Sequence, residues 1–415
     1  MSCSYQSTTE VTPFGTLCKN EYFVIFQKKM QMQIPKELLS KLIKFRKHLH
    51  HFPELSGNES VTSKTIIDFI ESTNPSEIVE NIGGYGVAAV YSSGNDGPTI
   101  LLRADMDALP IQESNQFEYR STVKDVAHLC GHDGHSAILT GVAHMLGQVS
   151  LAKGKVVLLF QPAEEVGRGA AAVIDDPKFK IVKPDYAFAL HNLPGFERGE
   201  VFIKENTFAS ASTGLIVKIK GLSSHAAHPE DGNNPDKALA QIILGLNFIN
   251  KFQNDFDDFS LLTIIHAKLG EIAFGTTPGN ATLMATLRTY LDSDMKKLKR
   301  EVESTIRNVC KEHKLQCDIE YTEEFPATVN NQECVSAIAN SASKQDISLH
   351  NLHEPFRWSE DFGHFTQISK AALFGIGSGK KHPQLHNEDY DFPDQIIEPS
   401  ISIFLGIVEE LLGFN

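Results

Sequence analysis

Cysteine and long apolar runs are both scarce in this sequence. Only six cysteines occur in 415 residues, and they are widely spaced apart from Cys310 and Cys317. Such spacing does not form a disulfide framework, so we expect a reducing compartment. No apolar run approaches the roughly 18 residues that a membrane helix needs. Residues 1–33 also lack the basic start and apolar core of a signal peptide, and we interpret them as a loosely structured extension. These absences predict a cytoplasmic protein without membrane association.

Basic residues are fewer than acidic ones, and repeats and low-complexity tracts are lacking. The sequence has 38 Lys and Arg against 52 Asp and Glu, which gives a formal net charge of −14. This surplus of negative charge disfavours nucleic acid as a partner and leaves small molecules open. The composition, with 41% hydrophobic and 22% charged residues, is that of an ordinary globular protein, and the length allows two domains.

Alternating helical and strand patterns occupy the first half of the chain. Apolar residues at helical spacing predict helices over 35–51 and 136–149. Short β-type runs predict strands over 86–91, 99–102, 155–160 and 185–190. Strands that alternate with helices predict an α/β sheet domain.

The pattern changes between residues 208 and 325. Strand patterns at 214–221, 261–269, 280–290 and 317–325 and helix patterns at 235–252 and 293–314 follow one another in the order βαββαβ. This order is ferredoxin-like, and the ends of such a unit lie close enough for insertion into another domain. The α/β pattern resumes afterwards, with helices near 331–345 and 399–412 and a strand near 371–376. We therefore predict a discontinuous catalytic domain, 34–207 with 326–415, interrupted by a lid at 208–325.

Two short motifs carry metal-binding side chains. The first is Cys-Gly-His-Asp-Gly-His at residues 130–135, and the second is Gln-Pro-Ala-Glu-Glu at residues 161–165. Thiolate, imidazole and carboxylate are the ligands that divalent transition metals accept, and a catalytic site also needs a base beside the metal. Each motif alone has a plain structural explanation, but together they predict a metal site.

Similar side chains follow four predicted strands. Asp105 and Asp107 follow the strand at 99–102, and Glu164 and Glu165 follow the strand at 155–160. His191 directly follows the strand at 185–190, and His386 closes a glycine-containing loop after the strand at 371–376. The carboxyl ends of strands in an α/β sheet gather functional side chains, so a common position for these residues is expected.

The motifs resemble those of the M20 metallopeptidase family. The similar segments run in collinear order from residue 36 to the C-terminus, and they lie at residues 46–50, 53–55, 103–110, 130–135, 161–165, 190–192, 223–227 and 385–387. The most similar branch is the amidohydrolases that cleave N-acyl amino acids, which include hippurate hydrolases, aminoacylases and auxin-conjugate hydrolases. The resemblance implies an α/β/α zinc-peptidase-like catalytic domain with the inserted lid.

The resemblance also implies roles for individual residues. The ligands of two divalent metal ions would be Cys130, His132, Glu165, His191 and His386. Glu164 would be the general base, because one glutamate must stay free of metal to move a proton. Asp107 would orient a ligand through a hydrogen bond, a role that Asp105 could exchange with it. The mixed ligand set suits Zn or Mn, with Co and Ni also compatible.

In the lid, the resemblance implies that His225 stabilises the oxyanion, often across a homodimer interface. Arg288 could clamp the substrate carboxylate or form a structural salt bridge. The sequence departs from the family where an Asn-Val-Ile-Pro run is expected, because Gly-Thr-Thr-Pro-Gly-Asn occupies 275–280, so that Asn280 could replace the usual asparagine. Trp358 could line the acyl pocket or belong to the core. These departures affect substrate preference and leave the metal chemistry intact.

The expected activity is metal-dependent hydrolysis of the amide bond of N-acyl or N-aroyl L-amino acids. A dipeptidase or carboxypeptidase on the same scaffold is the first alternative, since both substrate types have an amide bond to an amino acid. A non-catalytic metal-dependent binding protein is the second. Glu164 argues against a binder, because a binder needs no unligated base.

Overall fold

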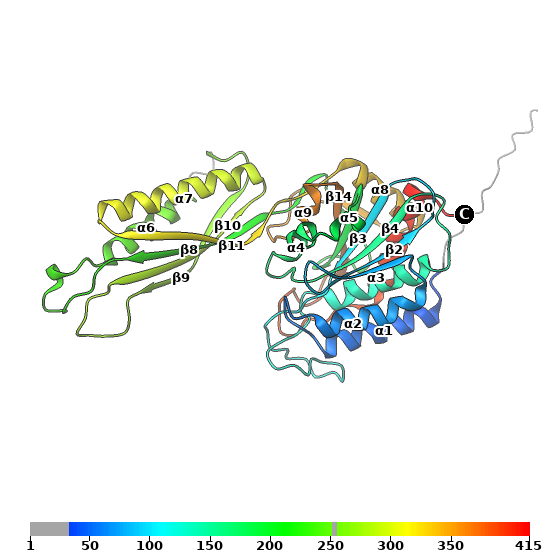
Figure 1. Ribbon diagram of the computed structural model, residues 1–415, viewed down its shortest axis with the longest axis horizontal. Helices are drawn as coiled ribbons and strands as arrows, with labels where there is room; N and C mark the ends of the chain where they lie inside the picture. Colours follow the sequence, from blue (N-terminus) through cyan, green and yellow to red (C-terminus); the bar gives the residue numbers. More distant parts are fainter. Residues whose placement is uncertain (1–32, 251–254) are drawn as a thin grey trace, which may run out of the picture. The chain divides into compact units, whose positions relative to one another are not determined.

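The structure is a computed structural model that describes residues 33–250 and 255–415. The extension predicted over residues 1–33 lies almost wholly outside the described residues, and so does the end of the helix predicted over 235–252. In the described part, the β-branched run Lys155–Gln161 forms a strand and the amphipathic run Asp292–Glu312 forms a helix, as the sequence predicts. Figure 1 follows these elements along the chain by colour.

The larger domain is built on an eight-stranded sheet with the order β1-β2-β4-β3-β5-β14-β6-β13. Its strands are β1 (Glu77–Ile82), β2 (Gly86–Ser92), β3 (Thr99–Asp105), β4 (Lys155–Gln161), β5 (Tyr186–Pro194), β6 (Val201–Ile203), β13 (Leu349–Asn351) and β14 (Lys370–Gly379). The four neighbours β4, β3, β5 and β14 are parallel. All seven residues of β3 are buried, which is typical of a sheet covered on both faces.

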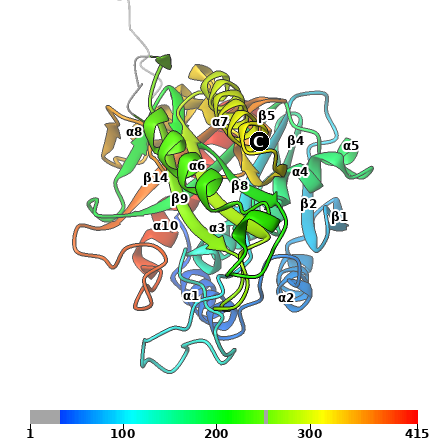
Figure 2. The same cartoon turned by 90° about the vertical axis from the view of Figure 1, so that its left-hand side faces the viewer.

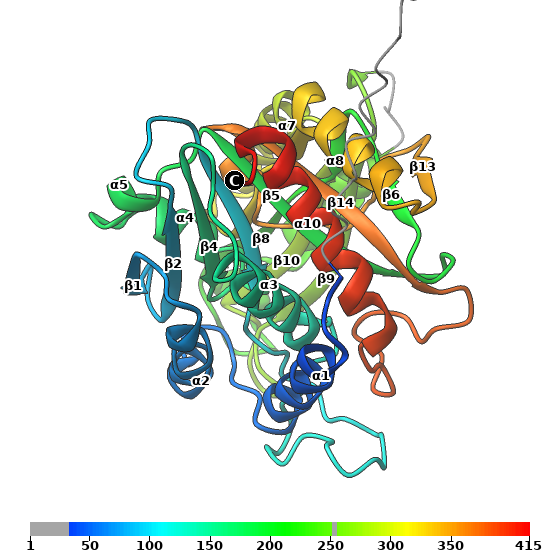
Figure 3. The same ribbon diagram turned by 90° about the vertical axis from the view of Figure 1, so that its right-hand side faces the viewer.

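Helices cover both faces of this sheet (Figure 3). On one face, α1 (Lys36–His51), α3 (His132–Leu146) and α10 (Ile397–Leu412) pack together, with α2 (Ser60–Ile70) against α3 and α8 (Gln332–Lys344) against α10. On the other face, α4 (Gly169–Asp175), α5 (Phe179–Val182) and α9 (Gly363–Thr366) contribute Val173, Phe179 and Phe365 to a core shared with Leu101 and Val157. The predicted α/β/α arrangement is confirmed.

The parallel strands bring their carboxyl ends to one edge of the sheet. Asp105 at the end of β3 pairs with Gln161 at the end of β4. His191 near the end of β5 pairs with Gly375 of β14. The loops that follow these strands are therefore the expected place for a ligand site.

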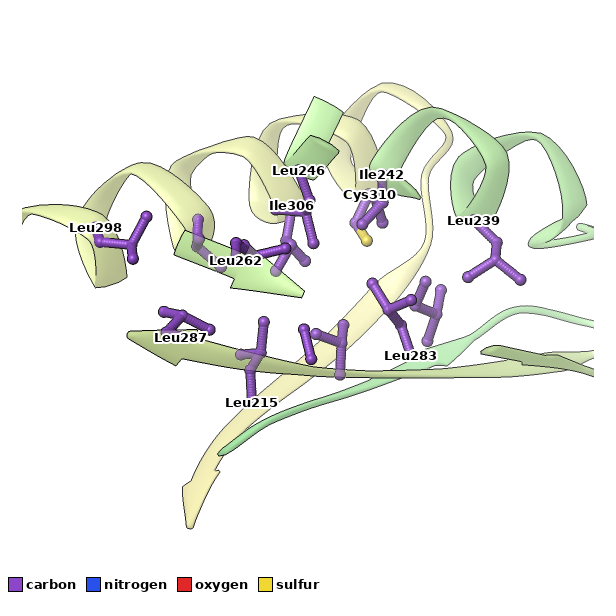
Figure 4. Packing of buried hydrophobic residues seen from close by; sticks show 14 of the residues in the cluster. Leu215, Leu239, Ile242, Leu246, Leu262, Leu283, Leu287, Leu298, Ile306 and Cys310 are labelled. Carbon is purple, nitrogen blue, oxygen red and sulfur yellow. The ribbon is translucent and has the colours of Figure 1, made fainter. Parts of the chain in front are cut away.

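A second, antiparallel sheet has the order β11-β8-β10-β9. Its chain order is β8 (Ala211–Lys220), α6 (Asp236–Ile249), β9 (Ser260–Leu269), β10 (Asn280–Thr289), α7 (Asp292–Glu312) and β11 (Gln316–Phe325). Both helices cover one face, as Figure 2 shows, and Figure 4 shows Leu283 and Leu287 of the sheet packed beneath Ile242 and Ile306 of the helices. The predicted ferredoxin-like unit is confirmed. We call it the lid.

The lid begins and ends beside a two-stranded sheet made of β7 (Asn206–Ala209) and β12 (Thr328–Asn330). Entry and exit are therefore adjacent, as insertion requires. Residues 34–415 form one compact unit by their contacts, so the boundaries proposed at 207/208 and 325/326 stay predictions.

Several elements differ from the sequence prediction. The helix expected to begin at residue 136 begins at His132, so α3 contains most of the first motif. The sequence pattern did not reveal α2 or β1.

Among the described residues, no helix is both long enough and apolar enough to cross a bilayer. The expected cytoplasmic location stays a prediction.

Candidate functional site

Five ligand-type side chains converge where the parallel strands end. Cys130 lies just before α3 and His132 is the first residue of that helix. His191 belongs to β5, Glu165 lies in the turn after β4, and His386 lies in the loop after β14. The resemblance to the family implied these five residues as metal ligands, and the fold brings all of them together.

The distances between the ligand atoms fit shared coordination of a metal ion. Cys130 Sγ lies 3.6 Å from His191 Nε2, and Glu165 Oε1 lies 3.7 Å from His132 Nε2. Glu165 Oε2 lies 3.8 Å from His386 Nε2. Two nitrogen, oxygen or sulfur ligands on one tetrahedral metal ion are about 3.3–3.8 Å apart.

Two atoms that point into this cluster have no hydrogen-bond partner. Within the described residues, His132 Nε2 and Glu165 Oε1 are buried and unsatisfied. A buried polar atom without a partner costs about 1–3 kcal/mol, so such atoms are rare and need an explanation. A cation bound between them would satisfy both, and the donor set therefore fits a divalent metal.

Backbone carbonyls orient the two buried ligand histidines. His132 Nδ1 donates a hydrogen bond to the carbonyl oxygen of Asp107 at 2.9 Å, and His191 Nδ1 donates to the carbonyl oxygen of Asn192 at 2.9 Å. A proton on Nδ1 leaves the lone pair on Nε2 directed at the cluster. Burial lowers the pKa of His191 to about 3, which keeps its imidazole neutral, the form that binds metal.

Asp107 holds the turn that carries the glutamates. Its carboxylate accepts hydrogen bonds from the backbone amides of Glu164 and Glu165, both at 3.1 Å, and from Ser56 Oγ at 2.6 Å. Asp105 has different partners, because it accepts from His135 Nδ1 at 2.6 Å. The contacts of Asp107 agree with its predicted positioning role.

The Glu164 carboxylate lies beside the cluster in a buried, acidic environment. Burial raises its pKa well above the usual range, and the carboxylates of Glu360 and Glu165 raise it further. Burial likewise raises the pKa of Glu165, to about 8. A positive ion in the cluster would lower both pKa values, because opposite charge favours the ionised form.

A fully buried arginine, which the sequence reasoning missed, supports this region. Arg103 forms ion pairs with Asp105 at 2.6 Å and with Glu360 and Asp361 at 2.8 Å each. The backbone amide of Asp361 in turn donates to Glu164 Oε1 at 3.4 Å. Arg103 therefore links Asp105, which bonds to His135, to residues 360–361, which contact Glu164. Its place beside Asp105 in the 103–110 motif was the available signal.

A pocket of about 260 Å³ lies over the cluster, between it and the open face of the lid sheet. Arg288 of β10 lines it, and its Nη1 donates to the carbonyl oxygen of Arg357 and to Ser359 Oγ, both at 3.0 Å. No carboxylate among the described residues forms an ion pair with Arg288, so the salt-bridge alternative is not observed. Trp358 also lines the pocket, with its ring centroid 5.3 Å from that of His191.

Two predicted lid residues lie elsewhere in the single chain. His225 is in a loop, where its Nδ1 accepts a hydrogen bond from the amide of Ala227 at 3.0 Å. Asn280, at the start of β10, lines a separate hollow of the lid beside Ser223. Among the described residues, neither belongs to the lining of the pocket over the cluster. Their catalytic and substrate-binding roles stay predictions.

Comparisons with known proteins agree with this geometry. The family model "Peptidase family M20/M25/M40" matches residues 101–410. A hippurate hydrolase of Campylobacter jejuni is 31% identical over 380 residues, which cover 91% of this chain and 98% of that protein. An uncharacterized hydrolase of Staphylococcus aureus strain bovine RF122 is 32% identical over 381 residues, 88% of this chain and 96% of that protein.

Solved structures show the same similarity in three dimensions. A crystal structure of a Bacillus subtilis protein, described as a dinuclear metal binding peptidase from the M20 family, superposes with a TM-score of 0.77 at 26% identity. The match covers 91% of this chain and 99% of that one. A crystal structure from methicillin resistant Staphylococcus aureus gives a TM-score of 0.82 at 25% identity over 91% of this chain and 97% of its own.

Proposed function

The chain belongs to peptidase family M20/M25/M40, a family of hydrolases, and from that premise we propose that it hydrolyses the amide bond of N-acyl or N-aroyl L-amino acids. The observation that carries the proposal is one pocket lined by four of the five metal-type ligands, by the buried carboxylate of Glu164 and by Arg288, which has no ion-pair partner among the described residues. The similarity to a hippurate hydrolase supports an acyl amino acid as the substrate.

The cofactor of the proposed reaction is a pair of divalent ions, Zn or Mn, with Co and Ni also compatible. Cys130, His132, Glu165, His191 and His386 would hold them. Bound there, the ions would supply Lewis acidity for the amide carbonyl and lower the pKa of a water molecule. The similarity to a dinuclear metal binding peptidase supports two ions in place of one.

Glu164 is the proton carrier in this proposal. Its carboxylate is buried beside the ligands, and the Asp361 amide fixes one of its oxygens. It takes a proton from the attacking water and delivers it to the nitrogen of the leaving amino acid, so a single residue serves both proton transfers. Asp107 keeps the turn in place through its two hydrogen bonds to the backbone amides.

The substrate ends have separate partners in the pocket. Arg288 has free donor capacity, because among the described residues its hydrogen-bond partners are one carbonyl and one hydroxyl. A guanidinium group pairs with a carboxylate in bidentate fashion. Trp358 stacks on Phe356 with ring centroids 4.8 Å apart and leaves part of its surface in the pocket. It suits an apolar acyl or aroyl group.

We also propose a homodimer formed through the lid. Strand β9 is an edge of the lid sheet, and Ile265 on that strand is 61% exposed, while Leu244 on the adjoining helix is 71% exposed. An exposed apolar edge strand favours pairing with a second copy. In such a dimer, His225 and Asn280 of one chain would reach the pocket of the other chain.

The dimer is tested by sedimentation velocity on the wild-type protein and on Ile265→Lys. The expected result is a dimer for the wild type and a monomer for the variant, because a charge at the edge opposes strand pairing. Lys268→Ala serves as the control. Lys268 lies on the same strand, and its side chain forms an ion pair with Glu271 of the same chain. A monomeric wild type would contradict the proposal.

The reaction is tested by the release of free amino acid from N-acetyl, N-benzoyl and indoleacetyl amino acids and from a few dipeptides, with added Mn or Zn and with chelator. Chelator-sensitive cleavage of the acyl amino acids alone supports the proposed reaction. Preferential cleavage of dipeptides would favour the peptidase alternative. Metal binding without turnover of any substrate would favour the binding-protein alternative.

A further inference from the structure

Strand β11 contains a bulge that faces the substrate pocket. Thr322 pairs with Gly214 of β8, and Phe325 pairs with Ser212. Two residues of β11, 323 and 324, therefore lie opposite the single residue 213 of β8. Glu323 lies in the extra step with φ +51°, a left-handed conformation that favours glycine. Non-glycine residues in this conformation are strained, and bulges of this kind often re-aim a side chain next to a functional site.

The bulge exchanges the faces of two neighbouring glutamates. In a regular strand Tyr321 and Glu323 would share one face and Thr322 and Glu324 the other. Tyr321 packs against the helix-covered core of the lid, yet Glu324 also lies on that side, where it forms an ion pair with Lys299 of α7 at 3.1 Å. Glu323 instead lines the pocket on the open face. The strained residue is thus the one presented to the substrate.

Glu323 has no partner in the protein to explain its position. It is exposed, and among the described residues no hydrogen bond or ion pair to its carboxylate is present. It shares the pocket with Arg288, which lies on β10 and pairs with Ser212 of β8, the residue that Phe325 of β11 also pairs with. One strand separates the two charged residues, so their Cα atoms are about 10 Å apart.

We propose that Glu323 selects acyl amino acids whose side chain is cationic, of the lysine, ornithine or arginine type. Arg288 binds the α-carboxylate while Glu323 binds the ammonium or guanidinium group of the same amino acid. Both residues belong to one sheet, so they address the same half of the substrate, the amino acid that leaves. This inference rests on the proposed amidohydrolase function and names its substrate class.

Turnover provides the first test. The quantity measured is the ratio of kcat/KM for N-acetyl-lysine to kcat/KM for its neutral analogue N-acetyl-norleucine, in wild type, Glu323→Gln and Glu324→Gln. The expected ratio falls about threefold to fivefold in Glu323→Gln, the size of a partly exposed ion pair. It stays at the wild-type value in Glu324→Gln, whose side chain lies on the opposite face. Equal ratios in all three proteins would overturn the proposal.

Charge reversal and salt give an independent check within the same assay. Glu323→Lys is expected to prefer N-acetyl-glutamate over N-acetyl-lysine, because the charge at the pocket wall is reversed. The preference of the wild type is expected to weaken between about 0.05 and 0.5 M salt, since screening weakens an exposed ion pair. A lysine preference that survives charge reversal would assign the selection to another residue.

Binding separates this proposal from the reaction itself. Calorimetric titration of metal-loaded Glu164→Gln with the same two ligands measures preference without turnover, and Glu164→Gln/Glu323→Gln is the comparison. Loss of the preference in the double variant supports the role of Glu323, even if no N-acyl amino acid is hydrolysed by the wild type. If the wild type hydrolyses both substrates, and each of the two variants binds both ligands with equal affinity, the role of Glu323 is refuted and the proposed reaction is left intact.

Discussion

Glu164 and Glu165 are neighbours in sequence and both lie near His132, but their other contacts differ. One oxygen of Glu164 accepts a hydrogen bond from the amide of Asp361 and the other lies 3.9 Å from His132 Nε2, whereas the two oxygens of Glu165 lie within 3.8 Å of two ligand histidines, His132 and His386. Residue type does not distinguish them, because both are glutamates, and burial distinguishes them little, because Glu164 is buried and Glu165 is half-buried. Their separate surroundings predict that the two substitutions fail in different ways.

Replacing Glu164 with Gln is expected to lower kcat by about 10²- to 10⁴-fold, the usual contribution of a general base. Its metal content is expected to remain near that of the wild type, because the side chain is not one of the five ligands. Glu165→Gln is expected to lose metal as well as turnover. Steady-state kinetics and elemental analysis of the purified variants measure both quantities. Near-normal turnover of Glu164→Gln would show that another group carries the proton.

Gly131 separates two of the ligands and adopts a conformation that a side chain opposes. Its φ is +96°, and a Cβ atom there would lie 2.5 Å from Oδ1 of Asn192, the residue after His191. Gly131→Ala is therefore expected to weaken metal retention by displacing ligands on both sides. Gly275→Ala, where an added Cβ meets nothing within 4 Å, is the control. Metal titration monitored by calorimetry measures the difference, and equal affinities would contradict the prediction.

At the scale of elements, α1 and α3 are joined by buried charges. Arg46 of α1 forms an ion pair with Asp133 of α3 at 3.1 Å. His50 of α1 bonds to Asp133 at 2.9 Å through Nδ1 and to Glu113 at 3.1 Å through Nε2. Burial alone would lower the pKa of His50, but its bonds to these carboxylates outweigh burial and raise the pKa to about 9.

This pKa predicts how stability depends on pH. The folded pKa of His50 lies above the unfolded value of about 6.5, so its contribution is complete below pH 6.5 and is lost as the pH rises through 9. The free energy of unfolding of metal-free protein is expected to fall over this interval, by up to about 3 kcal/mol from this group. Urea unfolding at pH 6.5 and pH 9.5 measures the loss.

The control for this prediction is a comparison of His50→Gln with His51→Gln. The first variant is expected to show a smaller loss of stability between the two pH values. The second is expected to behave as the wild type, because His51 bonds to the backbone carbonyl of Arg120 and not to a carboxylate. Equal pH dependence in all three proteins would assign the effect to other groups.

The sequence predicts the long, periodic elements and the local motifs, but not contacts between distant segments. The start of α3 at His132 was missed because the residues that open it are polar or glycine and lack apolar periodicity, although the site buries them. The ligands were found because each lies in a short motif that resembles a motif of the family. The pairing of Arg103 with Glu360 joins residues 257 positions apart, and only the folded sheet brings them together.

The position of Glu323 was missed for a related reason. Strand alternation read from the sequence places Glu324 on the open face, and the bulge that reverses this order leaves no sequence signal such as glycine. The positions of His225 and Asn280 follow from the lid, and a single chain does not bring them to the pocket. Their predicted roles depend on how two copies meet, which a motif does not encode.

At the scale of the whole molecule, the candidate metal centre ties four segments of the sheet domain together. Ions that bind only the folded chain stabilise it by mass action, about 2.7 kcal/mol for one site at a metal concentration 100 times the Kd. Chelation is therefore expected to lower the Tm by several degrees. Differential scanning calorimetry with and without chelator measures this shift, with Glu165→Gln expected to respond much less. An unchanged wild-type Tm would contradict metal binding at the cluster.

Strand β14 lies between β5 and β6 in the sheet although it is among the last elements of the chain. Until the ribosome has passed residue 379, β5 has an open edge, and the loop that carries His386 has not yet been made. A chain that ends before residue 370 lacks both β14 and the loop that carries His386. The set of ligands around Glu164 is therefore complete only after the last of the parallel strands and the loop behind it have been made.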